Sequence, residues 1–228
     1  HFKILEKTTK ALNGKALRKQ VSIYLGPEKK GPAMDLLLYL PSKAKGPVPV
    51  FIAPNFGGNH TIQNDKAIQL TSSWVRGRKH GAETNNNRAY EAGRGASRGR
   101  WPVEMIVGRG YGLATIYYGD IDPDFHDGFK NGIHPLFYQE GQTKPRPDEW
   151  GSIGAWAWGL SRGLDYLEKD SDVDASKVIV MGHSRLGKTA LWAGATDERF
   201  AIVISNNSGC GGAALSRRRF GETVKRIN

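Results

Sequence analysis

Two kinds of hydrophobic pattern alternate along the second half of the chain. Residues 152–169 carry apolar side chains in steps of three and four, and this spacing predicts an amphipathic helix. Short β-branched runs such as Val178–Met181 are typical of buried strands. The same reasoning predicts further strands over Lys19–Tyr24, Met34–Leu40, Val48–Ala53, Gly112–Tyr117 and Phe200–Ser205, and a helix over Val103–Arg109 with Pro102 at its start.

The stretch VIVMGHSRLGK, residues 178–188, joins a strand to a helix through a turn that contains a serine. Gly182 and Gly187 flank Ser184 in the spacing G-x-S-x-x-G, one residue longer than the common nucleophile-elbow motif. Such a turn needs small residues where the backbone nearly touches itself, and it directs the N–H groups of the following helix to one point. The motif predicts a nucleophilic serine; the alternative is a strand–helix turn with an incidental serine.

The order of predicted elements indicates an α/β protein. Two strands followed by β-α-β-α-β, with the serine at the end of a central strand, match the α/β-hydrolase plan, a three-layer α/β/α sandwich. In that plan the loop after the third strand donates a backbone N–H to an oxyanion. Here this loop contains Phe56 and Gly57, so they are the candidate oxyanion loop, unless it is a plain glycine turn. The polar segment 59–100 is predicted to be a long functional surface loop.

Net charge and the length of apolar runs indicate which classes of binding partner to expect. Lysine and arginine outnumber acids by 33 to 22, giving a net charge of +11, but the basic residues are scattered, with loose clusters at Arg76–His80, Arg94–Arg100 and Arg217–Arg219. Because no nucleic-acid motif accompanies them, we expect no nucleic-acid partner, and an acidic polysaccharide fits the charge equally well. No apolar run reaches the ~20 residues of a membrane span, so no membrane association is expected.

Cofactor chemistry is not indicated. The single cysteine, Cys210, excludes an intrachain disulfide and a multi-cysteine zinc site within these residues. Asp120, Asp122 and Asp124 form a carboxylate cluster that could bind calcium, but EF-hand spacing is absent and loop capping is the favoured interpretation. We therefore expect no metal and no cofactor.

Several stretches together resemble the bacterial glucuronoyl esterases of carbohydrate esterase family 15. They are GHSRLGK, SNNSGCGGAALSRRRFGE downstream, GSIGAWAWGLSRGLDYL upstream, APNFGGNHT and RGYGLATIYYGDIDPD. The resemblance covers nearly the whole chain. It implies a secreted or periplasmic serine esterase that hydrolyses the ester between 4-O-methyl-glucuronate of glucuronoxylan and lignin alcohols, using serine, histidine and an acid.

The resemblance also implies roles for three residues. Ser184 attacks the ester carbonyl, the Arg185 side chain stabilises the oxyanion, and Lys188 contacts the sugar hydroxyls. The alternatives are a surface arginine or a salt bridge at the elbow for Arg185, and a solvated helix lysine for Lys188. His183 is interpreted as a neighbour that packs the elbow and not as the base.

The chain departs from the family pattern in its base and its acid. Hydrolases of this plan run serine, acid, histidine, yet all six histidines precede Ser184. We therefore expect residues 1–228 to be the N-terminal part of a single domain whose remaining C-terminal part, with the last strands, supplies histidine and acid. His60 and His134 are the internal fallbacks for the base.

The catalytic acid of the triad, like the base, has no clear candidate in these residues. Asn207 stands where many members carry a glutamate, and Glu222 is a weak local candidate. Two other functions stay open. Another carboxylesterase such as an acetyl-xylan esterase would use the same scaffold, and the histidine order also admits an inactive carbohydrate-binding relative. Arg185 and Lys188 favour the glucuronoyl type.

Overall fold

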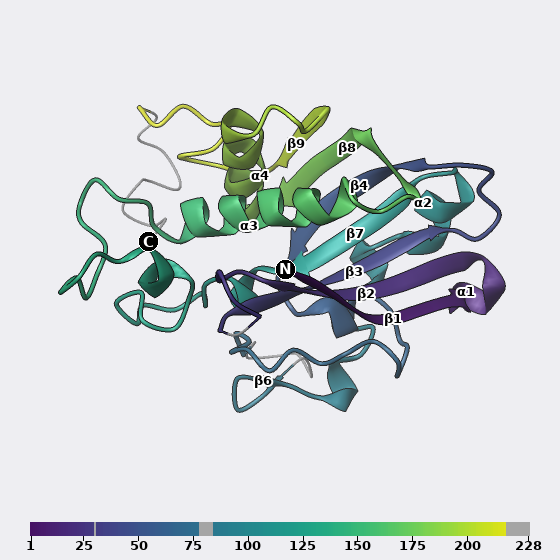
Figure 1. Ribbon diagram of the computed structural model, residues 1–228, viewed down its shortest axis with the longest axis horizontal. Coiled ribbons are helices and arrows are strands. Elements are labelled where there is room, and N and C mark those ends of the chain that lie inside the picture. The colour runs from purple at the N-terminus through teal and green to yellow at the C-terminus, as the bar shows by residue number, and fades with distance from the viewer. Residues whose placement is uncertain (30, 78–83, 218–228) are drawn as a thin grey trace.

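A mixed sheet of seven strands organises the described residues, which in this computed structural model are 1–29, 31–77 and 84–217 (Figure 1). The strand order is β1-β2-β3-β7-β4-β8-β9. β1, β2 and β3 are each antiparallel to the next strand in that order, whereas β7, β4, β8 and β9 run parallel. The strands are β1 (Phe2–Lys10), β2 (Ala16–Tyr24), β3 (Ala33–Pro41), β4 (Val48–Asn55), β7 (Gly112–Tyr117), β8 (Val173–His183) and β9 (Ile202–Asn206).

Helices connect the parallel strands. The α-helices of the described residues are α1 (Ala11–Gly14), α2 (Val103–Gly108), α3 (Ser152–Leu167) and α4 (Arg185–Thr196). Short 3-10 helices and a two-stranded ribbon complete the connections: η1 (Asn59–Thr61), β5 (Thr84–Asn85), β6 (Arg88–Ala89), η2 (Glu91–Gly93), η3 (Arg98–Arg100), η4 (Tyr118–Asp120) and η5 (His134–Phe137). Figure 1 shows α3 and α4 lying side by side over one face of the sheet.

The two faces of the sheet belong to two separate hydrophobic clusters. Leu36 and Leu38 of β3 pack into the cluster that contains the buried side chains of α3 and α4. Leu37 and Tyr39 of the same strand join the cluster that contains Val103 and Val107 of α2 (this is the two-residue alternation of a strand). Layers of helix therefore lie on both faces, which confirms the expected α/β/α architecture.

The predicted elements are confirmed with small shifts of their ends. The strand predicted over Gly112–Tyr117 has those limits as β7, and β8 begins earlier than expected, at Val173. The sequence analysis missed β1, Phe2–Lys10. Its side chains are mostly exposed or half-buried because it is the edge strand of the sheet, so it lacks a clear apolar alternation.

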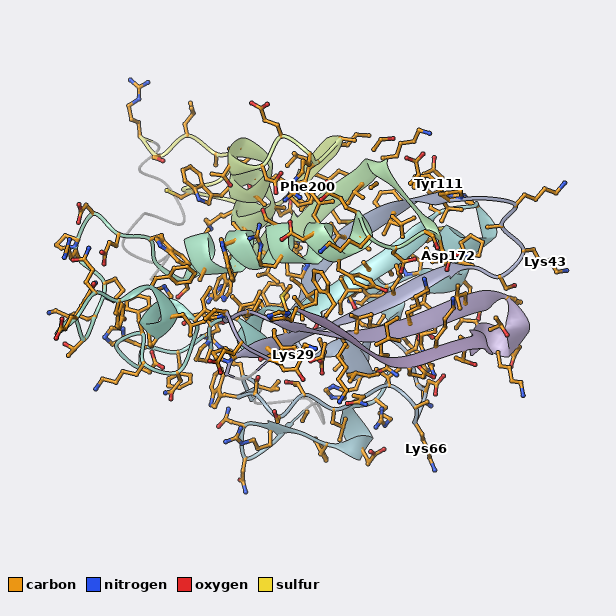
Figure 2. All side chains as sticks on the ribbon, viewed as in Figure 1. Lys29, Lys43, Lys66, Tyr111, Asp172 and Phe200 are labelled. Carbon is orange, nitrogen blue, oxygen red and sulfur yellow. The ribbon has the colours of Figure 1, made fainter. Side chains whose placement is uncertain are left out.

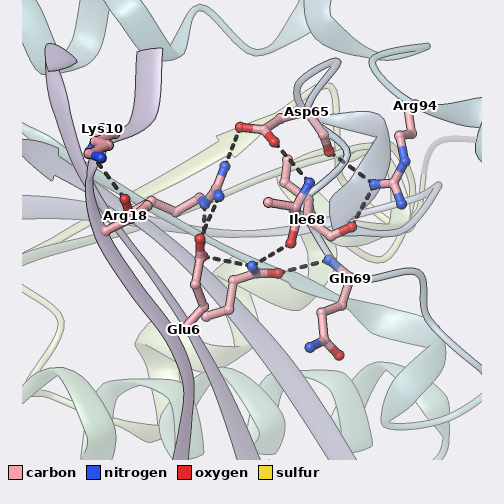
Figure 3. Close-up of polar contacts among 10 residues, drawn as sticks. Glu6, Lys10, Arg18, Asp65, Ile68, Gln69 and Arg94 are labelled. Carbon is pink, nitrogen blue, oxygen red and sulfur yellow. Dashed lines mark hydrogen bonds and ion pairs between the residues drawn. The ribbon is translucent and has the colours of Figure 1, made fainter. Parts of the chain in front are cut away.

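The long segment 59–100 is anchored more firmly than the predicted surface loop. Ile62 and Ile68 are buried in the α2-side cluster. The Arg94 guanidinium donates to the main-chain oxygens of Asp65 and Ile68, and its side chain is almost fully buried. Figure 3 shows Arg94 beside the segment it holds. Part of the Arg94–Arg100 cluster is therefore structural and does not form a basic surface.

A second arginine attaches this segment to the sheet. Arg18 of β2 is buried and binds Glu6 of β1 through two nitrogens and Asp65 through a third (Figure 3). Gln20 donates to Glu6 and to the main-chain oxygen of Ala67. Because these contacts join β1, β2 and residues 65–67, they fix the start of the long segment against the sheet.

Several other basic residues lie at separate places on the surface. Lys43 and Lys66 are exposed and project from different parts of the molecule (Figure 2). Arg76 pairs with Asp124, while residues 78–80 and 218–219 of the other two clusters lie outside the described residues. No helix in the described ranges is both long and apolar enough to cross a membrane.

A buried ion pair joins β2 to the start of β8. The Lys19 ammonium, 4% exposed, donates to both carboxylate oxygens of Asp170 at 2.5 and 2.7 Å and to Asp172 at 2.7 Å. Asp170 also accepts a hydrogen bond from the Tyr166 hydroxyl at 2.7 Å. The Lys19 ammonium holds the pKa of the Asp172 carboxyl below its usual value. Figure 2 labels Asp172 at this position.

We predict that Lys19→Met lowers the free energy of unfolding by about 3–5 kcal/mol, because it leaves the buried Asp170 carboxylate without a cation. The matched control is Lys7→Met. Lys7 is 54% exposed and 3.7 Å from Asp172, so its loss should cost less than about 1 kcal/mol. Urea denaturation of both variants measures the difference. If both variants lost the same free energy of unfolding, burial of the Lys19–Asp170 ion pair would contribute nothing to stability.

Candidate active site

Ser184 occupies a strained turn between β8 and α4. β8 ends at His183, α4 begins at Arg185, and Ser184 between them has φ 57° and ψ −127°. A non-glycine residue with this backbone conformation is rare and is held only by its surroundings, which is a feature of functional sites. The Ser184 N–H donates to the Asn206 oxygen at 3.0 Å, and its own carbonyl accepts from Gly187 at 2.8 Å. The expected position of Ser184 is confirmed.

The flanking glycines are required by close backbone contacts. A Cβ atom on Gly182 would lie 2.0 Å from the Leu186 carbonyl oxygen, and one on Gly187 would lie 3.0 Å from the Asn206 oxygen. The first distance excludes any side chain at Gly182 without movement of α4. The G-x-S-x-x-G spacing is therefore the spacing that this turn can accommodate, although it is longer than the common motif.

Strand register brings the candidate oxyanion loop to the same edge of the sheet. β4 and β8 are parallel with Ile52 opposite Val180, so Asn55 at the end of β4 is level with the end of β8. Phe56 and Gly57 follow directly, and the Phe56 ring packs edge-on against Tyr118 with centroids 5.5 Å apart.

Buried amide side chains fix the shape of this loop. Asn55 accepts the Gly58 N–H at 2.7 Å and donates to Asn59 at 2.8 Å, and Asn59 in turn donates to the Asp35 oxygen. The Gly58 N–H is thereby already engaged. Phe56 and Gly57 remain the candidates for an oxyanion donor, a role that stays a prediction.

Arg185 makes the salt bridge that the sequence analysis gave as an alternative. Its Nη1 lies 2.5 Å from Oδ1 of Asp124, and no other side-chain partner of Arg185 occurs among the described residues. Asp124 follows β7, the other neighbour of β4, and Tyr118 donates to its Oδ2 at 2.7 Å. The Arg185 side chain is about one third exposed, so it can both hold the carboxylate and reach a ligand.

The sequence analysis missed this role of Asp124, for which it favoured loop capping. The three carboxylates have separate partners: Thr71 donates to Asp120, His134 lies 3.3 Å from Asp122, and Arg185 binds Asp124. Burial raises the pKa of Asp120 to about 6. The available signal in the sequence was position. The DIDPD run follows the strand predicted over Gly112–Tyr117, and a strand parallel to the one before Ser184 ends at the same edge of the sheet.

Lys188 and His183 flank the elbow and differ in exposure. Lys188, one turn after Ser184, is only 4% exposed, so the interpretation as a solvated helix lysine is wrong. Gly212 lies against it, because a Cβ there would be 3.1 Å from the Lys188 Cγ. His183 is exposed, and its Nδ1 lies 3.1 Å from the side-chain amide of Asn206, the residue whose main-chain oxygen accepts the Ser184 N–H.

The internal histidine candidates are buried. His60 has no exposed surface, and burial, followed by the Arg94 charge, lowers its pKa to about 4. His134 lies between the rings of Phe129 and Trp150, at centroid distances of 4.6 and 5.1 Å. Both imidazole rings are therefore almost fully shielded from solvent. Asn207 is exposed with φ 46°, and Glu222 lies outside the described residues.

The sequence and the structure were compared with known proteins. The family model described as glucuronyl esterase, fungi, matches residues 135–226. Carbohydrate esterase MZ0003 from an unknown prokaryotic organism is 60% identical over 222 residues, which cover 97% of this chain and 51% of that protein. The chain thus spans about half the length of this curated relative.

Solved structures give the same assignment. A promiscuous CE15 esterase from a marine bacterial metagenome is 58% identical, with a TM-score of 0.88 over 100% of this chain and 56% of that one. A glucuronoyl esterase from Solibacter usitatus is 51% identical, with a TM-score of 0.88 over 97% of this chain and 55% of that one. The chain therefore belongs to carbohydrate esterase family 15, in which the marine metagenome esterase and the Solibacter enzyme are bacterial members that it resembles.

Proposed function

We propose that the whole protein is a serine esterase that hydrolyses esters of 4-O-methyl-glucuronate on glucuronoxylan with lignin alcohols. The observation that carries this proposal is the strained Ser184 at the strand–helix junction, followed directly by a partly exposed Arg185. The chain resembles a glucuronoyl esterase over nearly its whole length. Such a substrate lies outside the cytoplasm, so we propose a secreted or periplasmic enzyme.

The proposed reaction is acyl transfer through Ser184. The hydroxyl oxygen attacks the ester carbonyl, and a histidine takes the hydroxyl proton and delivers it to the departing lignin alcohol. Water then cleaves the acyl-enzyme and releases the glucuronic acid. Each step passes through a tetrahedral intermediate whose oxygen carries a negative charge.

Three sources of positive potential converge on that oxygen in the proposal. The Arg185 guanidinium is the first, the backbone N–H groups at the start of α4 are the second, and the Phe56–Gly57 loop is the third. The ester is uncharged, whereas the intermediate is an anion, so a cation here stabilises the transition state more than the bound substrate. Lys188 is proposed to bind the sugar hydroxyls.

We further propose that the base and the acid come from the remaining part of the protein. His60 and His134 are buried, and His60, with a pKa lowered to about 4, accepts a proton poorly at neutral pH. β9 presents Ile202, Val203 and Ile204 with 54%, 36% and 37% exposure, an apolar edge along which further strands could pair.

A broader carboxylesterase is the second candidate. The observation in its favour is that a relative 58% identical to this chain is described as promiscuous. Such an enzyme would use the same Ser184 and oxyanion site but would not distinguish a uronate ester from an acetyl ester.

The first test compares substrates. The full-length enzyme should cleave methyl or benzyl glucuronate with a kcat/KM at least about tenfold above that for acetylated xylan, because only the uronate ester carries its sugar hydroxyls on the acyl side of the scissile bond, where Lys188 is proposed to bind them. Ser184→Ala should abolish both activities. Equal rates on the two substrates would favour the broader carboxylesterase.

The second test addresses Arg185. In the full-length enzyme, Arg185→Ala should lower kcat on a glucuronate ester by about 10²-fold or more, because a charge opposite the oxyanion is lost. Arg185→Lys keeps the positive charge but loses the planar guanidinium, so its kcat should lie between those of the wild-type enzyme and Arg185→Ala. A change confined to KM would instead assign Arg185 to ground-state binding.

The third test addresses the base. Residues 1–228 purified alone should show esterase turnover roughly 10⁴-fold or more below the full-length enzyme, because a serine without its base retains only the contribution of the oxyanion site. Adding the C-terminal part as a separate chain or by fusion should restore activity. Full activity of residues 1–228 would contradict the proposal and would point to His60 or His134.

A further inference from the structure

Asp124 joins three segments of the chain at the edge of the candidate active site. Its Oδ1 binds Nη1 of Arg185, and its Oδ2 accepts the Tyr118 hydroxyl at 2.7 Å. Nη2 of Arg76 donates to its main-chain oxygen at 2.8 Å and lies 3.3 Å from Oδ2. Elements from the long segment, from the loop after β7 and from the elbow therefore meet on a single carboxylate, whose side chain is 11% exposed.

The contact with Asp124 selects one orientation of the Arg185 guanidinium. An arginine side chain has many rotamers, and ordering it in the transition state would cost conformational entropy. Asp124 binds Nη1 of Arg185 alone. The other two guanidinium nitrogens, Nε and Nη2, have no side-chain partner among the described residues. Those nitrogens can donate to an oxyanion, and their direction is set before substrate binds.

A carboxylate in this position also carries a cost, because it offsets the charge of Arg185. Arg76 supplies a second cation to the same carboxylate. Two guanidinium groups and one carboxylate sum to a net charge of +1, so the site stays positive while Arg185 is held. The Tyr118 hydroxyl adds a neutral hydrogen bond that anchors Asp124 without changing this charge.

We propose that Asp124 is the positioning residue for Arg185 and that Arg76 compensates its charge, so that Arg185 acts on the oxyanion as an oriented cation. The proposal rests on the esterase function proposed above. Asp124 acts here through Arg185 and does not touch the reacting atoms.

The matched variants are Asp124→Asn and Asp127→Asn in the full-length enzyme. Both remove one negative charge from the same loop, but within the described ranges Asp127 accepts only the main-chain N–H groups of Phe129 and Asn131. Asp124→Asn should lower kcat on methyl glucuronate by about tenfold or more with KM nearly unchanged, since the lost interaction serves the transition state. Asp127→Asn should keep kcat within about twofold, and Arg76→Gln should lower it by a smaller factor than Asp124→Asn.

A double-mutant cycle separates positioning from a general structural role. If Asp124 acts through Arg185, Asp124→Asn should cause no further loss of kcat in an Arg185→Ala background. Active-site titration with a phosphonate inhibitor corrects every rate for the fraction of folded enzyme. The same loss in both backgrounds, or equal rates for Asp124→Asn and Asp127→Asn, would overturn the proposal.

Failure of the proposed function would look different. If the wild-type enzyme leaves glucuronate esters intact, that function is wrong, and the cycle is then measured on p-nitrophenyl acetate. The crystal structure of the Asp124→Asn enzyme gives a readout independent of activity. The Arg185 guanidinium should leave its position there and keep it in Asp127→Asn, and an unmoved guanidinium would reject the positioning role.

Discussion

The close approach of Gly182 to the start of α4 is the constraint on which the candidate site depends. With 2.0 Å between a hypothetical Cβ and the Leu186 oxygen, only glycine allows the chain to reverse so sharply after β8. That reversal forces Ser184 into its positive φ and orients the first turn of α4 toward the same edge of the sheet. The strain costs on the order of 1–3 kcal/mol, which the surrounding structure must supply.

Backbone pairing and packing around the turn offset the strain at Ser184. β8 lies between β4 and β9, and the Ser184 N–H is bonded to Asn206 at the end of β9. α4 packs its buried residues against the same sheet face as α3. The turn is therefore held from both sides, and its geometry persists without any contribution from the serine side chain.

Parallel register then determines which loops meet the serine. The carboxyl ends of β7, β4 and β8 are level, so the loops that follow them share one edge. Asn55 and Asn59 fix the first loop through buried amide hydrogen bonds, and Tyr118 with Asp124 fixes the second. A single polar edge thus assembles from segments more than 60 residues apart, and Asp124 links it to Arg185.

The sequence by itself determined the α/β class, most strand positions and the place of Ser184, because apolar periodicity and glycine spacing are local properties of the chain. It missed β1, since an edge strand needs little apolar alternation. It did not predict that Asp124 pairs with Arg185 or that Lys188 is buried, because a salt bridge and a buried lysine depend on segments that approach only after the sheet has formed. Residue type and spacing thus identified the candidate nucleophile, whereas strand register and packing decided which charged side chains accompany it.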